Sequence, residues 1–174
     1  VRFFGGFDLD LAACSQEDYV GHGYAKGVPM GGDLVGRPDA AAPRFLVAAL
    51  KDAGSPGHGG LDLQRIQIIK GWVGADGTTH ERVVDVAGRA DETAGVDPDT
   101  CAPLGTGHTQ LCAVWQDPDF DSERPAFYYA RVLENPSCRW STFQCQAAGV
   151  NPFASACAEQ AAVATQAAQD EGAL

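Results

Sequence analysis

QRIQIIKGWV, residues 64–73, is the stretch of sequence that decides the fold class. It is rich in β-branched and aromatic residues, and strand alternation places Ile66, Ile68 and Trp72 on one face. The turn signal ADG follows at 75–77, and THERVVDV at 79–86 has the composition of a second strand. Together these stretches predict a β-hairpin.

The rest of the chain predicts further strands and two helices. Strands are expected at residues 1–7, 44–50, 109–116 and 126–134. One helix is expected to begin at the N-cap Ser15 and to end near Gly27. A second is expected to start at Asn151-Pro152 and to continue through the Ala-rich stretch to Asp170.

Residues 88–108 are polar and rich in Gly, so a long loop is expected there. No strand–helix–strand alternation is present. The chain is therefore predicted to be mainly β, with β-sandwich-like antiparallel sheets, two peripheral helices and long loops braced by disulfides. Residues 1–150 would form the β-rich segment and residues 151–174 a C-terminal Ala-rich helix.

Length and charge restrict the function classes. The 174 residues fit one domain, and a hydrophobic content of 45% is enough for a core. The net charge of −11 disfavours nucleic acid and anionic membranes as partners. No apolar run approaches the roughly 20 residues that span a bilayer. Because Val1 lies inside a predicted strand, we expect a chain that is cleaved, truncated or partly resolved.

Six cysteines indicate the compartment, and none of them forms a C-x-x-C pair. An even number in separate loops favours three disulfides, and hence the periplasm or the cell exterior, over free buried thiols. The spacings suggest local bridges from Cys101 to Cys112 and from Cys138 to Cys145, which leaves Cys14 to pair with Cys157. This connectivity is a hypothesis, because six cysteines allow many pairings.

The carboxylates and histidines are the candidates for metal and acid–base sites. Asp117, Asp119 and Asp121 alternate as calcium ligands do, but no Gly or Glu completes a calcium loop, and an Asp-Pro turn is the preferred interpretation. His80 and Glu81 are neighbours in a strand and face opposite ways, so they are predicted to be solvated rather than an acid–base pair.

Two further groups are assigned structural roles. Asp18 and His22 lie four apart on the first helix, where a surface pair is preferred to a metal site because no third ligand is apparent. The three tryptophans are predicted to pack in the core or against disulfides, with an exposed sugar-binding platform as the alternative; they are Trp72, Trp115 and Trp140.

Several motifs occur together in a characteristic order. They are FFGGFD at 3–8, GVPMGGDL at 27–34, PRFL at 43–46, DLQRIQIIKGW at 62–72, THE at 79–81, VWQDPDFD at 114–121, AFYYARVLENP at 126–136 and RW at 139–140. In this order they resemble the C-terminal part of the domain of unknown function 3604 family, from residue 1 to about residue 150.

The resemblance implies a longer parent protein that resembles metal-dependent phosphoesterases and binds divalent metal ions. The signature Gly-Asp-Leu-His-x-His, which would ligate those metals, is absent here, and so is the family's closing Trp-Ser-Ser-Pro-Ile-Trp-Tyr-like segment. No catalytic residue, metal ligand or cofactor is therefore assigned to this chain. Asp33, in a Gly-rich loop, is the candidate for facing the parent's active site, with an ordinary loop carboxylate as the alternative.

Two functions follow as expectations. In the first, the chain is the non-catalytic C-terminal portion of an exported protein and packs against a catalytic domain absent from these residues. Its partner is then the remainder of the parent polypeptide. In the second, it is a secreted binding or accessory subunit docked on a larger assembly through an unpaired strand edge.

Overall fold

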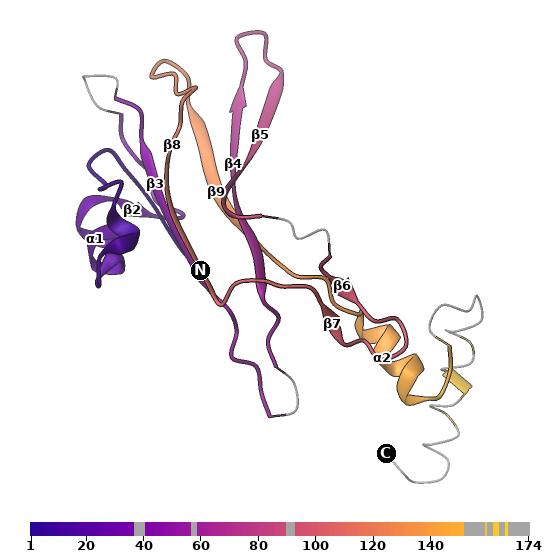
Figure 1. The fold of residues 1–174 in the computed structure, drawn as a ribbon. Coiled ribbons are helices and arrows are strands. Elements are labelled where there is room, and N and C mark those ends of the chain that lie inside the picture. The colour runs from indigo at the N-terminus through magenta and orange to yellow at the C-terminus, as the bar shows by residue number, and fades with distance from the viewer. Residues whose placement is uncertain are drawn as a thin grey trace. The chain divides into compact units, whose positions relative to one another are not determined.

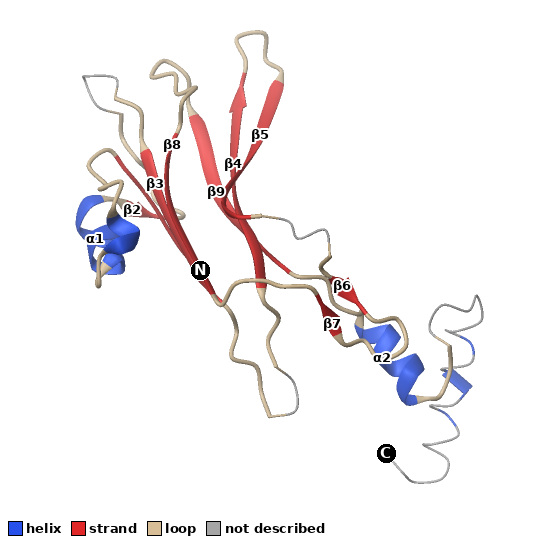
Figure 2. Cartoon of the chain, viewed as in Figure 1, coloured by secondary structure: helices blue, strands red, loops and turns tan. Residues whose placement is uncertain are grey.

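The computed structural model describes residues 1–36, 41–56, 59–89 and 93–151, together with Glu159, Ala162, Val163 and Gln166. The fold is mainly β, with antiparallel sheets and two α-helices in these ranges (Figure 1, Figure 2). The chain divides into two compact units. The sheet unit comprises residues 1–92 and 106–135, and the small unit comprises residues 93–105 and 136–174.

Two antiparallel sheets form the sheet unit. The first has the strand order β2-β1-β3-β8, with β1 at Arg2–Gly6, β2 at Val28–Pro29, β3 at Arg44–Leu50 and β8 at Gln110–Gln116. The second has the order β5-β4-β9, with β4 at Leu63–Val73, β5 at Thr79–Gly88 and β9 at Ala126–Glu134. The predicted strands and the β4–β5 hairpin are confirmed, and Gly77 supplies the positive φ of 81° in the hairpin turn.

The main core lies between the two sheets. Alternate residues of each strand point inward, so one face of each sheet contributes to a single cluster. Its buried members are Phe3, Phe45, Val47, Ala49, Leu63, Ile66, Ile68 and Leu111. This packing of sheet on sheet confirms the predicted β-sandwich-like arrangement.

A second cluster covers the other face of the first sheet. Phe4 and Leu46 point away from the main core and are buried against Leu9 and Ala13 of the segment that leads into the helices. Helix α1, Tyr19–Lys26, lies on this side, and Gly23 is required there because a Cβ atom would overlap the ring of Phe4. The first sheet is thus covered on both faces.

The start of the first helix differs from the prediction. Ser15 ends a separate 3-10 turn, η1, at Ala13–Ser15. Asp18 is the N-cap of α1 instead, and its Oδ1 accepts the Gly21 N–H at 2.7 Å. Gly27 ends the helix, as predicted.

The small unit contains elements that the sequence did not indicate. Residues 88–108 were predicted to be a loop, but β6, Gly95–Val96, pairs there with β7, Pro103–Leu104. Helix α2, Trp140–Ala147, is also new, and it leaves Trp140 74% exposed, so the predicted packing role of this side chain is wrong. Most of the predicted final helix and of the 151–174 segment lies outside the described residues.

The disulfides are formed, but the predicted pairing is wrong. Cys14 of η1 bonds Cys112 of β8 within the sheet unit, because strand alternation turns Cys112 toward the helical side of the first sheet. Cys101 bonds Cys138 within the small unit. Cys145 is also disulfide-bonded, and Cys157 lies outside the described residues.

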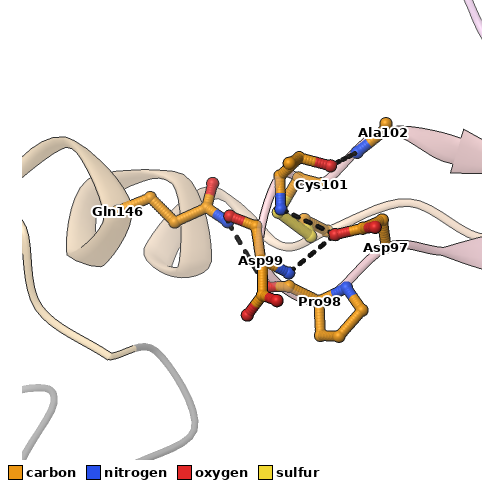
Figure 3. The surroundings of a disulfide bond; sticks show 8 residues. Asp97, Pro98, Asp99, Cys101, Ala102 and Gln146 are labelled. Carbon is orange, nitrogen blue, oxygen red and sulfur yellow. Dashed lines mark hydrogen bonds between the residues drawn. A yellow bond between two sulfur atoms is a disulfide. The ribbon is translucent and has the colours of Figure 1, made fainter.

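The Cys101–Cys138 bond is set in a loop with its own hydrogen bonds (Figure 3). Cys101 has a φ of 56°, and its N–H donates to the carbonyl oxygen of Asp97 at 2.8 Å. Gln146 of α2 donates to the carbonyl oxygens of Pro98 and Asp99 at 3.4 and 2.9 Å. Hydrogen bonds from the backbone N–H groups of Thr100 and Asp99 lower the pKa of Asp97. The ionised carboxylate of Asp97 therefore stabilises this turn. The loop is therefore tied both to the disulfide and to α2.

Candidate functional site

A buried ion pair occupies one end of the sheet unit. The Lys70 Nζ donates to Asp117 Oδ2 at 2.5 Å and to the carbonyl oxygen of Asp119 at 2.8 Å. The Asp117 side chain is only 1% exposed. Its Oδ2 also accepts a hydrogen bond from the Tyr128 hydroxyl at 2.6 Å, and its Oδ1 accepts one from the Asp119 N–H at 3.0 Å. Both charges are therefore largely removed from water and joined by a shared set of hydrogen bonds.

Strand alternation explains how a lysine comes to lie between the sheets. Lys70 follows Ile66 and Ile68 on the inward face of β4 and stands opposite Tyr128 of β9. Asp117 immediately follows β8 and reaches the same place from the first sheet. Burial raises the pKa of Tyr128, and the hydrogen bond to Asp117 and its negative charge raise it further. The phenol thus remains a proton donor throughout the neutral range.

The three alternating aspartates each face a basic side chain. Asp117 pairs with Lys70, Asp119 with Arg82, and Asp121 with Arg124 at 3.0 Å. The Asp119 N–H bond to Asp117 closes the Asp-Pro turn that the sequence favoured. Within the described ranges no group of three or more His, Cys, Asp or Glu side chains could hold a metal ion. These residues therefore do not fit the divalent metals that the family resemblance implies.

His80 has structural contacts within the second sheet. The His80 ring stacks on Trp72 with 5.2 Å between centroids, and Lys70 Nζ lies 5.3 Å from the same Trp72 ring. His80 is paired with Trp72 across the hairpin and Glu81 with Gly71, so His80 and Glu81 face opposite ways, as predicted. Because Lys70 and His80 both approach Trp72, its ring is not an open sugar platform.

The predicted pair of Asp18 and His22 is replaced by other contacts. Asp18 caps α1, whereas His22 Nε2 accepts the backbone N–H of Asp10 at 3.0 Å. Trp115 stacks on Phe45 of the core with 5.9 Å between centroids, in keeping with the predicted packing role. Asp18 and His22 therefore have separate structural roles and do not form a pair.

A cleft of about 590 Å³ opens at the same end of the sheet unit. One wall is the segment from Val28 to Leu34, and the other is the connection between β8 and β9. Its floor is formed by the rings of Phe3, Phe45 and Tyr128, with 5.7 Å between the first two centroids and 4.2 Å between the last two. Asp33 lines this cleft, and whether it also faces a catalytic domain stays a prediction.

The outer face of the second sheet is the other candidate surface. Ile69 is buried at its centre, but the side chains around it are exposed. These are Phe127 at 62%, Val73 at 55%, Val83 at 43% and Tyr129 at 37% exposure. Phe127 lies over Gly71 of β4, where a Cβ atom would overlap the Phe127 ring. We call Val73, Val83, Phe127 and Tyr129 the outer patch.

These features define the chain as a disulfide-braced, mainly β protein with two packed antiparallel sheets. It belongs to the family described as "Protein of unknown function (DUF3604)", whose model matches residues 1–166. No curated protein and no solved structure matches the chain. No helix among the described residues is long and apolar enough to cross a membrane.

The basic residues of the site were missed by the sequence analysis. Lys70 carries the buried ion pair, and Arg82 and Arg124 bind the neighbouring carboxylates. One signal was available: Lys70 follows Ile66 and Ile68 in the alternating pattern of the inward face, so it had to be buried together with a counter-ion. Nothing in the sequence identified that counter-ion as Asp117.

Proposed function

We propose that this chain is the non-catalytic C-terminal portion of an exported protein that resembles metal-dependent phosphoesterases. It packs against a catalytic domain that lies outside these residues. The observation that carries the proposal is the outer patch. The chain covers both faces of its first sheet with its own residues, whereas the second sheet leaves aromatic and aliphatic side chains in solvent.

The composition of that face supports a protein partner. The half of the second sheet nearest the β4–β5 turn carries the outer patch, with the exposed Glu81 opposite Gly71 at its β5 edge. The other half is a polar ladder in which Gln67 donates to Asp85 at 2.6 Å and accepts from Arg131 at 2.6 Å. An apolar patch with a polar border is typical of protein–protein contact surfaces, where the apolar part is buried and the border stays hydrated.

The disulfides support an exported location. Cys14, Cys101, Cys112, Cys138 and Cys145 are all disulfide-bonded. Such bonds persist in the periplasm or outside the cell and are rare in reducing compartments. In the proposed protein the divalent metals are bound by the catalytic domain, and this chain braces that domain and shapes the approach to it, with Asp33 on the cleft wall.

The test combines the chain with the phosphoesterase-like domain of the same source that carries the Gly-Asp-Leu-His-x-His signature. Native mass spectrometry should detect a one-to-one complex for the wild-type chain and for the control Val35→Asp, since Val35 is exposed but lies off the outer patch. Val83→Asp should lose the complex, because it places a charge in the buried contact. Equal binding by all three chains, or no complex with the wild-type chain, contradicts the proposal.

The absence of catalysis is tested separately. The isolated chain, incubated with Mg²⁺, Mn²⁺ or Zn²⁺ and a chromogenic phosphodiester, should give no turnover above that of the metal alone. Turnover that is lost on unfolding of the chain would assign the chemistry to these residues and contradict the proposal.

The second candidate is a secreted accessory subunit that docks on an unrelated assembly. The same outer patch favours it, and the net charge of −11 would direct it to a basic partner. The native mass of material purified from the source organism separates the two candidates. A phosphoesterase-like polypeptide in the complex supports the first candidate, and an unrelated protein supports the second.

A further inference from the structure

We propose that the cleft of the sheet unit is a binding site for a small organic cation of the alkylammonium type. This inference goes beyond the proposed packing function, with which it shares Phe127 and Asp33. The cleft measures about 590 Å³, which is within the size range of small-molecule sites. Six aromatic residues line it, namely Phe3, Phe7, Phe45, Phe120, Phe127 and Tyr128.

The rings give the cleft the electrostatic character that a cation requires. The faces of aromatic rings carry partial negative charge, and a cation within about 6 Å of a ring centroid is attracted to it. Phe3 and Phe45 are 6% and 4% exposed and support the cleft from beneath, so the rings that a ligand can reach are those of the half-buried Phe7, Phe120 and Tyr128. The alkyl substituents of a bound ammonium group would contact these rings in place of water, and its charge would be attracted to them.

The charged residues of the cleft have the complementary sign. Asp33, Asp121, Glu123 and Arg124 all line it. Arg124 is already paired with Asp121 at 3.0 Å, which neutralises both. In the described part of the chain no basic side chain forms an ion pair with Asp33 or Glu123. Among the described residues, Asp33 and Glu123 are therefore carboxylates without an ion-pair partner beside an aromatic floor.

This combination discriminates among ligand classes. An anion would be repelled by Asp33 and Glu123. A bare metal ion would need several converging oxygen ligands, and no such group occurs among the described residues. A neutral apolar molecule would gain contact with the rings but no attraction from the carboxylates, which are exposed and hydrated. An organic cation satisfies both the rings and the carboxylates.

The test uses choline and its neutral isostere, in which a tert-butyl group replaces the trimethylammonium group. Isothermal titration of the whole chain should give saturable binding of choline at one site. The isostere should bind about tenfold more weakly, because it has the same shape but lacks the charge that the rings attract. Absence of saturable choline binding, or equal affinity for the two compounds, overturns the proposal.

Three charge-neutralising variants locate the site. Asp33→Asn and Glu123→Gln should each weaken choline binding about three- to tenfold and leave binding of the isostere unchanged. Glu17→Gln is the matched control, because it removes the same charge from an exposed position outside the cleft, and its affinity for choline should equal that of the wild type. If all three variants weaken choline binding equally, the attraction comes from the overall charge of the chain, and the assignment to the cleft is wrong. Thermal unfolding of each variant verifies that the fold is kept.

Discussion

Replacing Lys70 by Met should destabilise the sheet unit far more than the loss of an ordinary ion pair. Lys70 and Asp117 have side-chain exposures of 8% and 1%, so the substitution leaves a carboxylate in the interior with only the Tyr128 hydroxyl and one backbone N–H as donors. Removing one member of a buried pair costs about 3–5 kcal/mol. For a chain of this size that corresponds to a fall in Tm of about 6–20 °C.

The assay is chemical and thermal unfolding followed by circular dichroism, with a matched control and a double variant. Lys51 also forms a 2.6 Å bridge, to Asp62, but at 31% and 37% side-chain exposure, so Lys51→Met should cost no more than about 1 kcal/mol. The double variant Lys70→Met/Asp117→Asn should be more stable than the sum of its single changes by about 2 kcal/mol. A cost for Lys70→Met that equals the cost for Lys51→Met would refute the reasoning, because it would mean that water reaches the pair.

Three further outcomes are expected. The pKa of Tyr128 is raised from its ordinary value of 10.0, so above about pH 10 its phenol ionises in the unfolded state but not in the folded state. The free energy of unfolding should therefore fall as the pH rises above about 10. Tyr128→Phe should lack this contribution in urea titrations. Removing the Cys14–Cys112 bridge by double Ser substitution should cost about 4–5 kcal/mol of stability, because the bridge joins residues 98 apart in the sequence. Peptide mapping of the unreduced wild-type chain should recover this pair. Gly71→Ala should displace the Phe127 ring, which is 62% exposed and can move outward, so it should cost about 1 kcal/mol or less, and the cost should shrink in a Phe127→Ala background.

Local sequence was sufficient for the strands and the hairpin because their signals are local. Alternation in residues 64–73 and the Asp-Gly turn specify β4 and β5 without reference to the rest of the chain. The same reasoning failed where two local signals competed. Ser15 and Asp18 are both good N-caps, and only the burial of Ala13 in the second cluster places Ser15 in η1 and leaves Asp18 to start the helix.

The disulfide pairing could not be predicted because it depends on the order of strands in the first sheet. Cys101 and Cys112 are close in sequence, yet Cys112 lies in β8, which pairs with β3. Its side chain points toward the η1 turn, where it bonds Cys14. Short spacing favours a bridge only when nothing else fixes the backbone between the two residues. Here the chain between them passes from the small unit to the sheet unit, so its course is determined by strand pairing.

The buried ion pair shows how the cleft and the fold depend on each other. Lys70 occupies an inward position that an aliphatic residue would fill at lower desolvation cost. In return, its ammonium group fixes Asp117 and the carbonyl oxygen of Asp119, which anchors the connection between β8 and β9. That connection is one wall of the cleft, and Tyr128, which donates to the same carboxylate, is part of its floor. Replacement of the pair by apolar residues should therefore preserve the sheets but loosen the wall, so binding in the cleft would be lost before stability is.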